Sequence, residues 1–258
     1  MNNWQQNLQI IKQLTVTDFK LRYSGSFLGY LWSLLKPLVF FLVLYIVFGK
    51  MLKLGGNIEN FANYLLIGIM LWSFFAETTT NGMQAVVSKS HLIKKIYFPR
   101  IIVVIVTSLN ALINLFFNLL VLILLMSYFQ VDVFQAKTFL IVFYILELWL
   151  LSFGSALILS VLFVYWRDFN YIWELFLQIL FYLTPIIYAL SLIPAQYLNL
   201  VMLNPLAQII TDFRAVFLDF SHQPNWYYPW PQFALVLLIF VTGLFLFQTQ
   251  QKKFAEQI

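Results

Sequence analysis

Residues 88–100 read SKSHLIKKIYFPR and place four basic side chains within thirteen positions. The apolar segment GIMLWSFF at residues 68–75 precedes this cluster, and 31 uncharged residues follow it at 101–131. A short basic segment between two long apolar segments is typical of a loop that joins two membrane-spanning helices. The stretch therefore predicts one span on each side of it.

The composition supports a membrane protein. Of the 258 residues, 62% are hydrophobic and 10% are charged, whereas soluble domains average about 45–50% apolar and about 25% charged residues. A helical span needs about 20 apolar residues, and long uninterrupted apolar runs favour helices over a barrel. We expect an all-α integral membrane protein of one transmembrane domain, 1–258. Its six transmembrane helices are predicted near residues 27–49, 61–79, 101–129, 138–165, 171–190 and 232–248.

The segment between the fifth and sixth spans is broken by proline. Residues 175–211 are uncharged, but Pro185, Pro194 and Pro205 interrupt them. Proline removes a helix hydrogen bond and disfavours helix in the residue before it. We therefore predict a re-entrant segment of two half-helices on the extracytoplasmic side at 193–218, with charged residues at a wet rim.

The distribution of Lys and Arg predicts the orientation of the spans. With six crossings, eleven basic residues lie on the side of the two termini and four lie on the other side. Because basic residues are enriched on the cytoplasmic side, both termini are expected in the cytoplasm. The first group is Lys12, Lys20, Arg22, Lys36, Lys89, Lys94, Lys95, Arg100, Arg167, Lys252 and Lys253, and the second is Lys50, Lys53, Lys137 and Arg214.

Two cytoplasmic segments are amphipathic. In the loop at 84–100, apolar residues alternate with the basic ones, which suits the docking of a partner better than a positive-inside signal alone does. At 1–26, apolar residues recur at three- and four-residue steps, which predicts an interfacial helix on the cytoplasmic leaflet. This helix is either a membrane anchor or part of energy coupling.

Catalytic motifs are missing from the sequence. It has no GxxxxGK[ST] run and no cysteine, and its two histidines, His91 and His222, fall on opposite sides of the membrane. The chain is therefore expected to hydrolyse no ATP, to bind no metal or other cofactor, and to contain no catalytic residue. A membrane-embedded enzyme that acts on lipid-linked sugars stays open as an alternative, with Asp168, Asp212 or Asp219 as its acids.

Several motifs in their order along the chain resemble one family, the membrane subunits of polysaccharide-exporting ABC transporters. They are RYSGSFLGYLWSLLKP at 22–37, LIKKIYFPR at 92–100, WRD at 166–168, TPIIY at 184–188, and the Asn204-Pro205 turn followed by Arg214.

The resemblance implies a homodimer of this chain with two copies of a separate ATP-binding cassette ATPase, which holds ATP and Mg. It further implies export of a lipid-linked polysaccharide, such as O antigen, capsule or teichoic acid, across the bacterial cytoplasmic (inner) membrane. A chain in this membrane is expected to contact membrane lipid, and it is expected to have no nucleic acid partner. An ABC exporter permease for another cargo, such as a drug or a lipid, is a further alternative.

Three groups of residues are candidates for function. The resemblance makes the 84–100 loop the site of ATPase coupling, through Ser88, Lys89, His91, Leu92, Lys94 and Lys95. Aromatic rings stack on sugars, so the mouth of the substrate channel is assigned to Arg22, Tyr23, Phe27, Tyr30 and Trp32. The half-helices are expected to form either an outer gate that closes by dewetting or a passive cap, through Leu198, Val201, Met202, Leu203, Asn204, Pro205, Asp212 and Arg214.

Overall fold

The computed structural model describes residues 3–24, 26, 29–53, 58, 60–96, 98–128, 139–218 and 229–254. Within these ranges the chain forms helices and no strand, which confirms the all-α prediction. The α-helices are α1 (Asn3–Tyr23), α2 (Trp32–Leu44), α3 (Phe61–Ser88), α4 (Ser90–Lys95), α5 (Ile101–Tyr128), α6 (Leu140–Tyr165), α7 (Phe169–Leu183), α8 (Ala195–Met202), α9 (Pro205–Phe217) and α10 (Pro229–Gln250). A π-helix, η2 (Tyr45–Met51), continues α2, and the 3₁₀ turns η1 (Gly29–Leu31) and η3 (Leu190–Leu192) precede α2 and α8.

Within the described ranges, five helical segments are long and apolar enough to cross a membrane, which makes the chain a multi-pass membrane protein. They are α2 with η2, α3, α5, α6 and α10. α3 runs nine residues past its predicted end at Thr79, and the Thr79 hydroxyl donates to the Phe75 carbonyl of its own helix at 2.8 Å. The hydroxyl is thus satisfied by its own helix, and α3 continues to Ser88.

The predicted fifth span, 171–190, is shorter than expected. α7 ends at Leu183 because Thr184 precedes Pro185 and adopts an extended conformation. Its 15 residues measure about 22 Å, which is less than the hydrocarbon core of about 30 Å. Residues 184–189 continue from its end as a non-helical segment.

The predicted half-helices are present as α8 and α9. Their axes are bent by 101° at a short break, and the Asn204 side chain caps α9 by accepting from the Leu206 amide at 3.0 Å. Pro205 occupies the first turn of α9, where its missing N–H costs nothing. A broken pair of this kind fits the predicted re-entrant segment.

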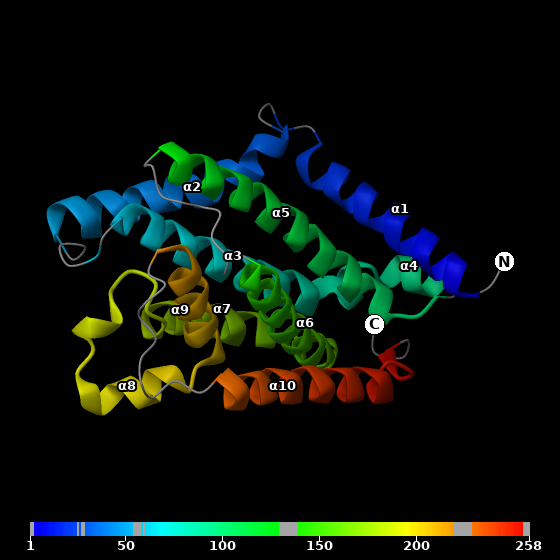
Figure 1. Cartoon of the computed structure of the whole chain (residues 1–258). Coiled ribbons are helices and arrows are strands. Elements are labelled where there is room, and N and C mark those ends of the chain that lie inside the picture. The colour runs from blue at the N-terminus through cyan, green and yellow to red at the C-terminus, as the bar shows by residue number, and fades with distance from the viewer. Residues whose placement is uncertain are drawn as a thin grey trace.

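α3 lies at the centre of the helix assembly and packs against α5 on one side and α6 on another (Figure 1). α10 packs against α6, where the two backbones meet at glycines: a Cβ added to Gly243 would lie 2.4 Å from the Gly154 carbonyl oxygen. Small residues allow such close approach between membrane helices. α2, in contrast, has no buried residue.

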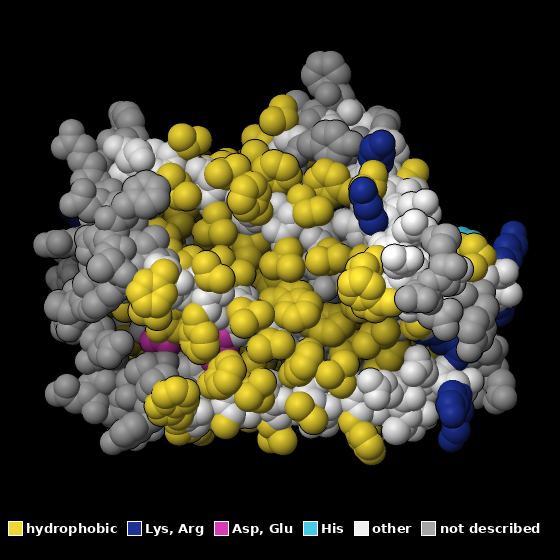
Figure 2. Space-filling model, turned by 45° about the vertical axis from the view of Figure 1, so that its right-hand side comes forward, with side chains coloured by type: hydrophobic (Ala, Val, Ile, Leu, Met, Phe, Trp, Pro, Cys, Tyr) yellow, Lys and Arg dark blue, Asp and Glu magenta, His cyan; other side chains and the backbone are white. Residues whose placement is uncertain are grey.

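α1 lies along α5 (Figure 1). Ile10, Ile11 and Leu14 of α1 pack against a core cluster that includes Phe98 and Phe254. The start of α1 and the end of α10 lie toward the same end of the assembly. Figure 2 shows a broad hydrophobic surface across the middle of one face, with most of the visible Lys and Arg side chains toward one end.

Candidate functional site

The coupling loop predicted at 84–100 contains α4, a short helix at the end of the assembly that also holds the start of α1 (Figure 1). Residues 84–88 of the predicted loop belong to α3. The apolar side chains Leu92 and Ile93 of α4 pack against the core of the chain. Ser88, His91, Lys94 and Lys95 are exposed. Leu92 therefore anchors the helix, and the polar and basic side chains are presented outward.

Two ion pairs connect α1 to α3 and to the start of α4. Lys89, which precedes α4, pairs with Asp18, and Arg22 pairs with Glu77 of α3. Asp18 and Arg22 are four residues apart, so they lie on one face of α1. The same face of α1 thus reaches both the predicted coupling loop and the middle of α3.

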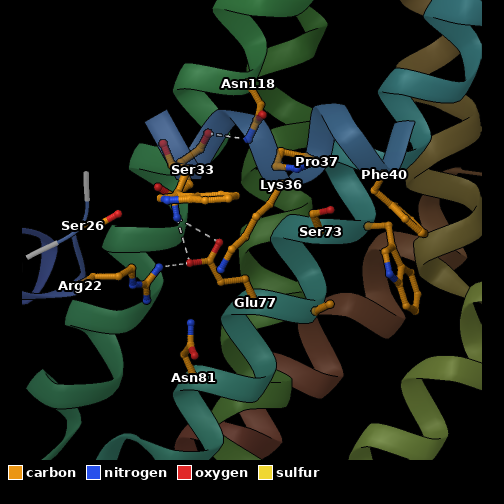
Figure 3. A pocket seen from close by; sticks show the side chains of 14 residues that line it. Arg22, Ser26, Ser33, Lys36, Pro37, Phe40, Ser73, Glu77, Asn81 and Asn118 are labelled. Carbon is orange, nitrogen blue, oxygen red and sulfur yellow. Dashed lines mark hydrogen bonds and ion pairs between the residues drawn. The ribbon is translucent and has the colours of Figure 1, made fainter. Parts of the chain in front are cut away.

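A cavity of about 830 Å³ lies where the end of α1 meets α2, α3 and α5. Its apolar wall is made of Trp32, Pro37, Phe40, Trp72 and Ala76, and its polar wall of Arg22, Ser26, Ser33, Lys36, Ser73, Glu77, Asn81, Asn114 and Asn118 (Figure 3). The charged side chains of this lining are two cations and one carboxylate. The cavity therefore carries a net charge of +1.

Glu77 organises the polar wall. Its carboxylate accepts hydrogen bonds from Asn114 Nδ2 at 2.9 and 3.1 Å, in addition to its ion pair with Arg22 (Figure 3). Lys36 extends into the cavity from α2 on the other side of Glu77. Among the described residues, Lys36 has no hydrogen-bond or ion-pair partner.

The structure places two of the five predicted channel-mouth residues, Arg22 and Trp32, in the lining of this cavity. Phe27 and the side chains of Tyr23 and Tyr30 lie outside the described part of the chain.

A second polar centre lies where α9, the start of α3 and the segment after α7 meet. The Arg214 guanidinium donates to three carbonyl oxygens, those of Tyr64 at 3.0 Å, Pro185 at 2.5 Å and Ile186 at 2.9 Å. Its Cζ lies 3.5 Å from the centre of the Tyr64 ring, which adds a cation–π contact. Asn204 donates to Thr184 Oγ1 at 3.0 Å.

The prediction that Asp212 and Arg214 lie at a wet rim is wrong. Their exposed fractions are 7% and 4%, respectively. The sequence of 193–218 did not reveal the burial of Arg214, because the partners of Arg214 are backbone carbonyls from two distant segments. The Arg214 guanidinium can be buried because its hydrogen bonds to these carbonyls replace those that it would make to water.

The remaining gate candidates differ in exposure. Met202 is buried, Leu198, Val201, Asn204 and Pro205 are partly buried, and Leu203 is exposed. The alternative enzyme site gains no support from this geometry. Asp219 lies outside the described residues, and the described part of the chain contains no group of three His, Asp or Glu side chains that would hold a metal ion.

Sequence reasoning did not identify Glu77, Asn114 or Tyr64 as parts of these centres. A signal existed for Glu77, because a carboxylate inside a predicted span is unusual and functional by default. Asn114 and Tyr64 carry no comparable signal, since single Asn and Tyr residues are ordinary in membrane helices.

Comparisons with known proteins bear on both centres. The sequence pattern of the ABC-2 type transporter family matches residues 9–218, which include α1 from residue 9 onward, the cavity, α4 and Arg214. The chain is 28% identical over 243 residues to the O-antigen export system permease protein RfbA of Klebsiella pneumoniae, covering 94% of this chain and 92% of the relative.

Two further relatives cover most of the chain. The O-antigen export system permease protein RfbA of Myxococcus xanthus is 29% identical over 255 residues, covering 96% of this chain and 95% of the relative. The polysialic acid transport protein KpsM of Escherichia coli is 24% identical and covers 78% of each chain. The similarity to the RfbA proteins thus extends over nearly the full length of both chains.

Proposed function

This chain belongs to the ABC-2 type transporter family, and on that premise we propose that it is the channel-forming permease subunit of an ATP-driven exporter of a lipid-linked polysaccharide. The observation that carries the proposal is the near full-length similarity to the O-antigen export permeases, supported by the relative named for polysialic acid transport. The cargo classes that fit are O antigen, capsule and teichoic acid.

The proposed assembly is a homodimer of this chain with two copies of an ATP-binding cassette ATPase, which binds ATP and Mg. It lies in the bacterial cytoplasmic membrane with both termini in the cytoplasm. The gathering of basic side chains toward the end of the assembly that holds α4 supports this orientation (Figure 2).

α4 is the proposed docking element for the ATPase. His91, Lys94 and Lys95 are exposed on it, whereas Leu92 and Ile93 fix it to the core. The ion pairs of Lys89 with Asp18 and of Arg22 with Glu77 then carry movement of α4 through α1 to the wall of the cavity. This arrangement favours the role in energy coupling for α1 over a simple anchor.

α8 and α9 are the proposed outer gate. The apolar side chains of Leu198, Val201, Met202 and Leu203 close a narrow mouth by dewetting, and Arg214 holds α9 against the rest of the chain. Cysteines placed at 198–203 in this cysteine-free chain are expected to crosslink across the dimer at rest and to block export until they are reduced. Continued export while crosslinked would leave the passive cap as the explanation.

Deletion of the chain tests the proposed function, and charge reversal on α4 tests the proposed docking role. Lys94→Glu with Lys95→Glu is expected to abolish co-purification with the ATPase encoded in the same cell and to stop surface display of the glycan. The matched control reverses Lys252 and Lys253, which are also exposed and follow α10.

The control variant is expected to retain assembly and export, and both variants should insert into the membrane in equal amount. Normal assembly and export by the Lys94→Glu, Lys95→Glu variant would contradict the docking role. A surface glycan that is unchanged when the whole chain is deleted would contradict the proposed function itself.

A further inference from the structure

The cavity between α1, α2, α3 and α5 has the chemistry of an anion site inside a membrane protein. Arg22 and Lys36 contribute two positive charges and Glu77 one negative charge. The carboxylate is already engaged by Arg22 and by Asn114. The charge that is left over is that of Lys36, which has no partner among the described residues.

A lysine in this position needs an explanation. It lies on the fifth residue of α2, within a segment long and apolar enough to span a membrane. A lysine near the end of a span usually reaches outward to the polar headgroups of the bilayer. Figure 3 instead shows the Lys36 side chain extending into the cavity toward Glu77.

The rest of the lining suits a ligand that is both anionic and partly apolar. Ser73, Asn81 and Asn118 add hydroxyl and amide donors, whereas Trp32, Trp72 and Phe40 provide aromatic surface. The buried Asn114 also has a side-chain oxygen without a hydrogen-bond partner, which can accept from a hydroxyl group. The volume of about 830 Å³ lies within the range of about 300–1,000 Å³ that is usual for small-molecule sites.

We propose that this cavity binds the phosphate-bearing headgroup of a lipid, with the Lys36 ammonium group paired to the phosphate. Ammonium–phosphate contacts are charge-assisted hydrogen bonds and are stronger than neutral ones. α2 has no buried residue, so the side of the cavity that α2 forms is not enclosed by the rest of the chain. Resting on the proposed function, we assign the headgroup to the phosphate that links the exported glycan to its lipid, with the aromatic wall beside the first sugar.

Binding to the full-length chain in phosphatidylcholine nanodiscs tests the proposal without the ATPase and without transport. The probe is farnesyl diphosphate, titrated by calorimetry. Lys36→Gln is expected to weaken its binding about tenfold, which corresponds to about 1.4 kcal/mol. Lys36→Arg, which keeps the charge, is expected to stay within a few-fold of the unaltered chain.

The matched control is Lys50→Gln. Lys50 is an exposed cation farther along the same helical segment and is not part of the cavity lining. It is expected to bind the probe like the unaltered chain. Farnesol, which lacks the phosphates, is expected to bind weakly and with no dependence on Lys36. Equal binding of farnesyl diphosphate by the Lys36→Gln variant and the unaltered chain would overturn the proposal.

Competition identifies the source of the phosphate. Displacement of the probe by a lipid-linked sugar diphosphate, but not by equal amounts of phosphatidylglycerol or inorganic phosphate, supports the assignment to the export substrate. Equal displacement by phosphatidylglycerol would overturn that assignment in favour of a bulk phospholipid, and equal displacement by inorganic phosphate would overturn a lipid site. Failure of the proposed function would appear separately, as unchanged glycan export on deletion of the chain.

Discussion

Arg214 and Lys36 are both cations within or beside apolar helices, and their surroundings are opposite. Arg214 is buried, and its guanidinium reaches the carbonyls of Tyr64, Pro185 and Ile186. Lys36 is exposed on the wall of a cavity and has no partner among the described residues. One cation is satisfied by the protein, and the other is available to a ligand.

This difference in partners predicts different roles for the two cations: Arg214 stabilises the fold, and Lys36 binds a ligand. A buried cation with several hydrogen bonds holds its segments together, and its removal leaves those acceptors without donors. A cation in an open, polar cavity contributes little to folding and can be replaced without loss of structure. The effects on stability should therefore decrease from the Arg214 centre to Lys36, whereas the effects on ligand binding should increase.

The largest effect on stability is expected from Arg214→Ala. Three carbonyl oxygens lose a charged donor, and a loss of about 3 kcal/mol or more is expected. Thermal unfolding in detergent and the yield of monodisperse protein measure it. The stability of Arg214→Lys should fall between those of Arg214→Ala and the unaltered chain, because an ammonium group keeps the charge but not the planar set of donors. An unchanged melting temperature for Arg214→Ala would contradict the structural role of this centre.

The second-largest loss of stability is expected from Gly68→Ala. A Cβ at this position would lie 2.2 Å from Arg214 Nη2 and 3.2 Å from Ile186 Cγ2. The guanidinium cannot move aside without losing its carbonyl contacts, so we expect a loss of about 1–3 kcal/mol. The same unfolding assay applied to Gly68→Ala, Arg214→Ala and the double variant tests the cause. Additive losses would show that Gly68 and Arg214 do not interact.

A smaller effect on stability is expected from Arg22→Ala. The ion pair with Glu77 is partly exposed, with 33% and 26% of the two side chains accessible, so the cost is below about 1 kcal/mol after allowance for solvent screening. Because Arg22 links α1 to the cavity wall, ATP-driven export should fall more than stability does. Arg22→Lys is the matched variant, and its export should recover in part. A loss of export that only follows the loss of protein would contradict the coupling role.

The smallest effect on stability is expected from Lys36→Gln. The unfolding free energy should change by no more than about 0.5 kcal/mol, since Lys36 has no partner among the described residues. Glycan export should nevertheless decrease, and Lys50→Gln should leave both properties unchanged. A melting temperature that drops as far as that of Gly68→Ala would make Lys36 structural and would remove the contrast with Arg214.

Several features followed from the sequence alone, and each has a local cause. The apolar runs predicted the spans that form α2 with η2, α3, α5, α6 and α10, the prolines predicted the broken pair at 193–218, and the basic loop predicted a separate element between α3 and α5. The early end of the fifth predicted span, at Leu183 and not at residue 190, was not predicted. Motif order predicted the family that the comparisons show. These features depend on residues that are neighbours in the chain, so a linear pattern contains them.

Only the tertiary structure decided which residues meet. Arg22 and Glu77 are 55 positions apart, Glu77 and Asn114 are 37 apart, and Arg214 and Tyr64 are 150 apart. A helix that is apolar on every side gives no periodic signal of its inward face, so the rotation of α2, α3 and α5 could not be predicted. Arg214 was misplaced at a wet rim for a different reason. Its burial depends on backbone carbonyls, and a carbonyl is present at every residue whatever the sequence.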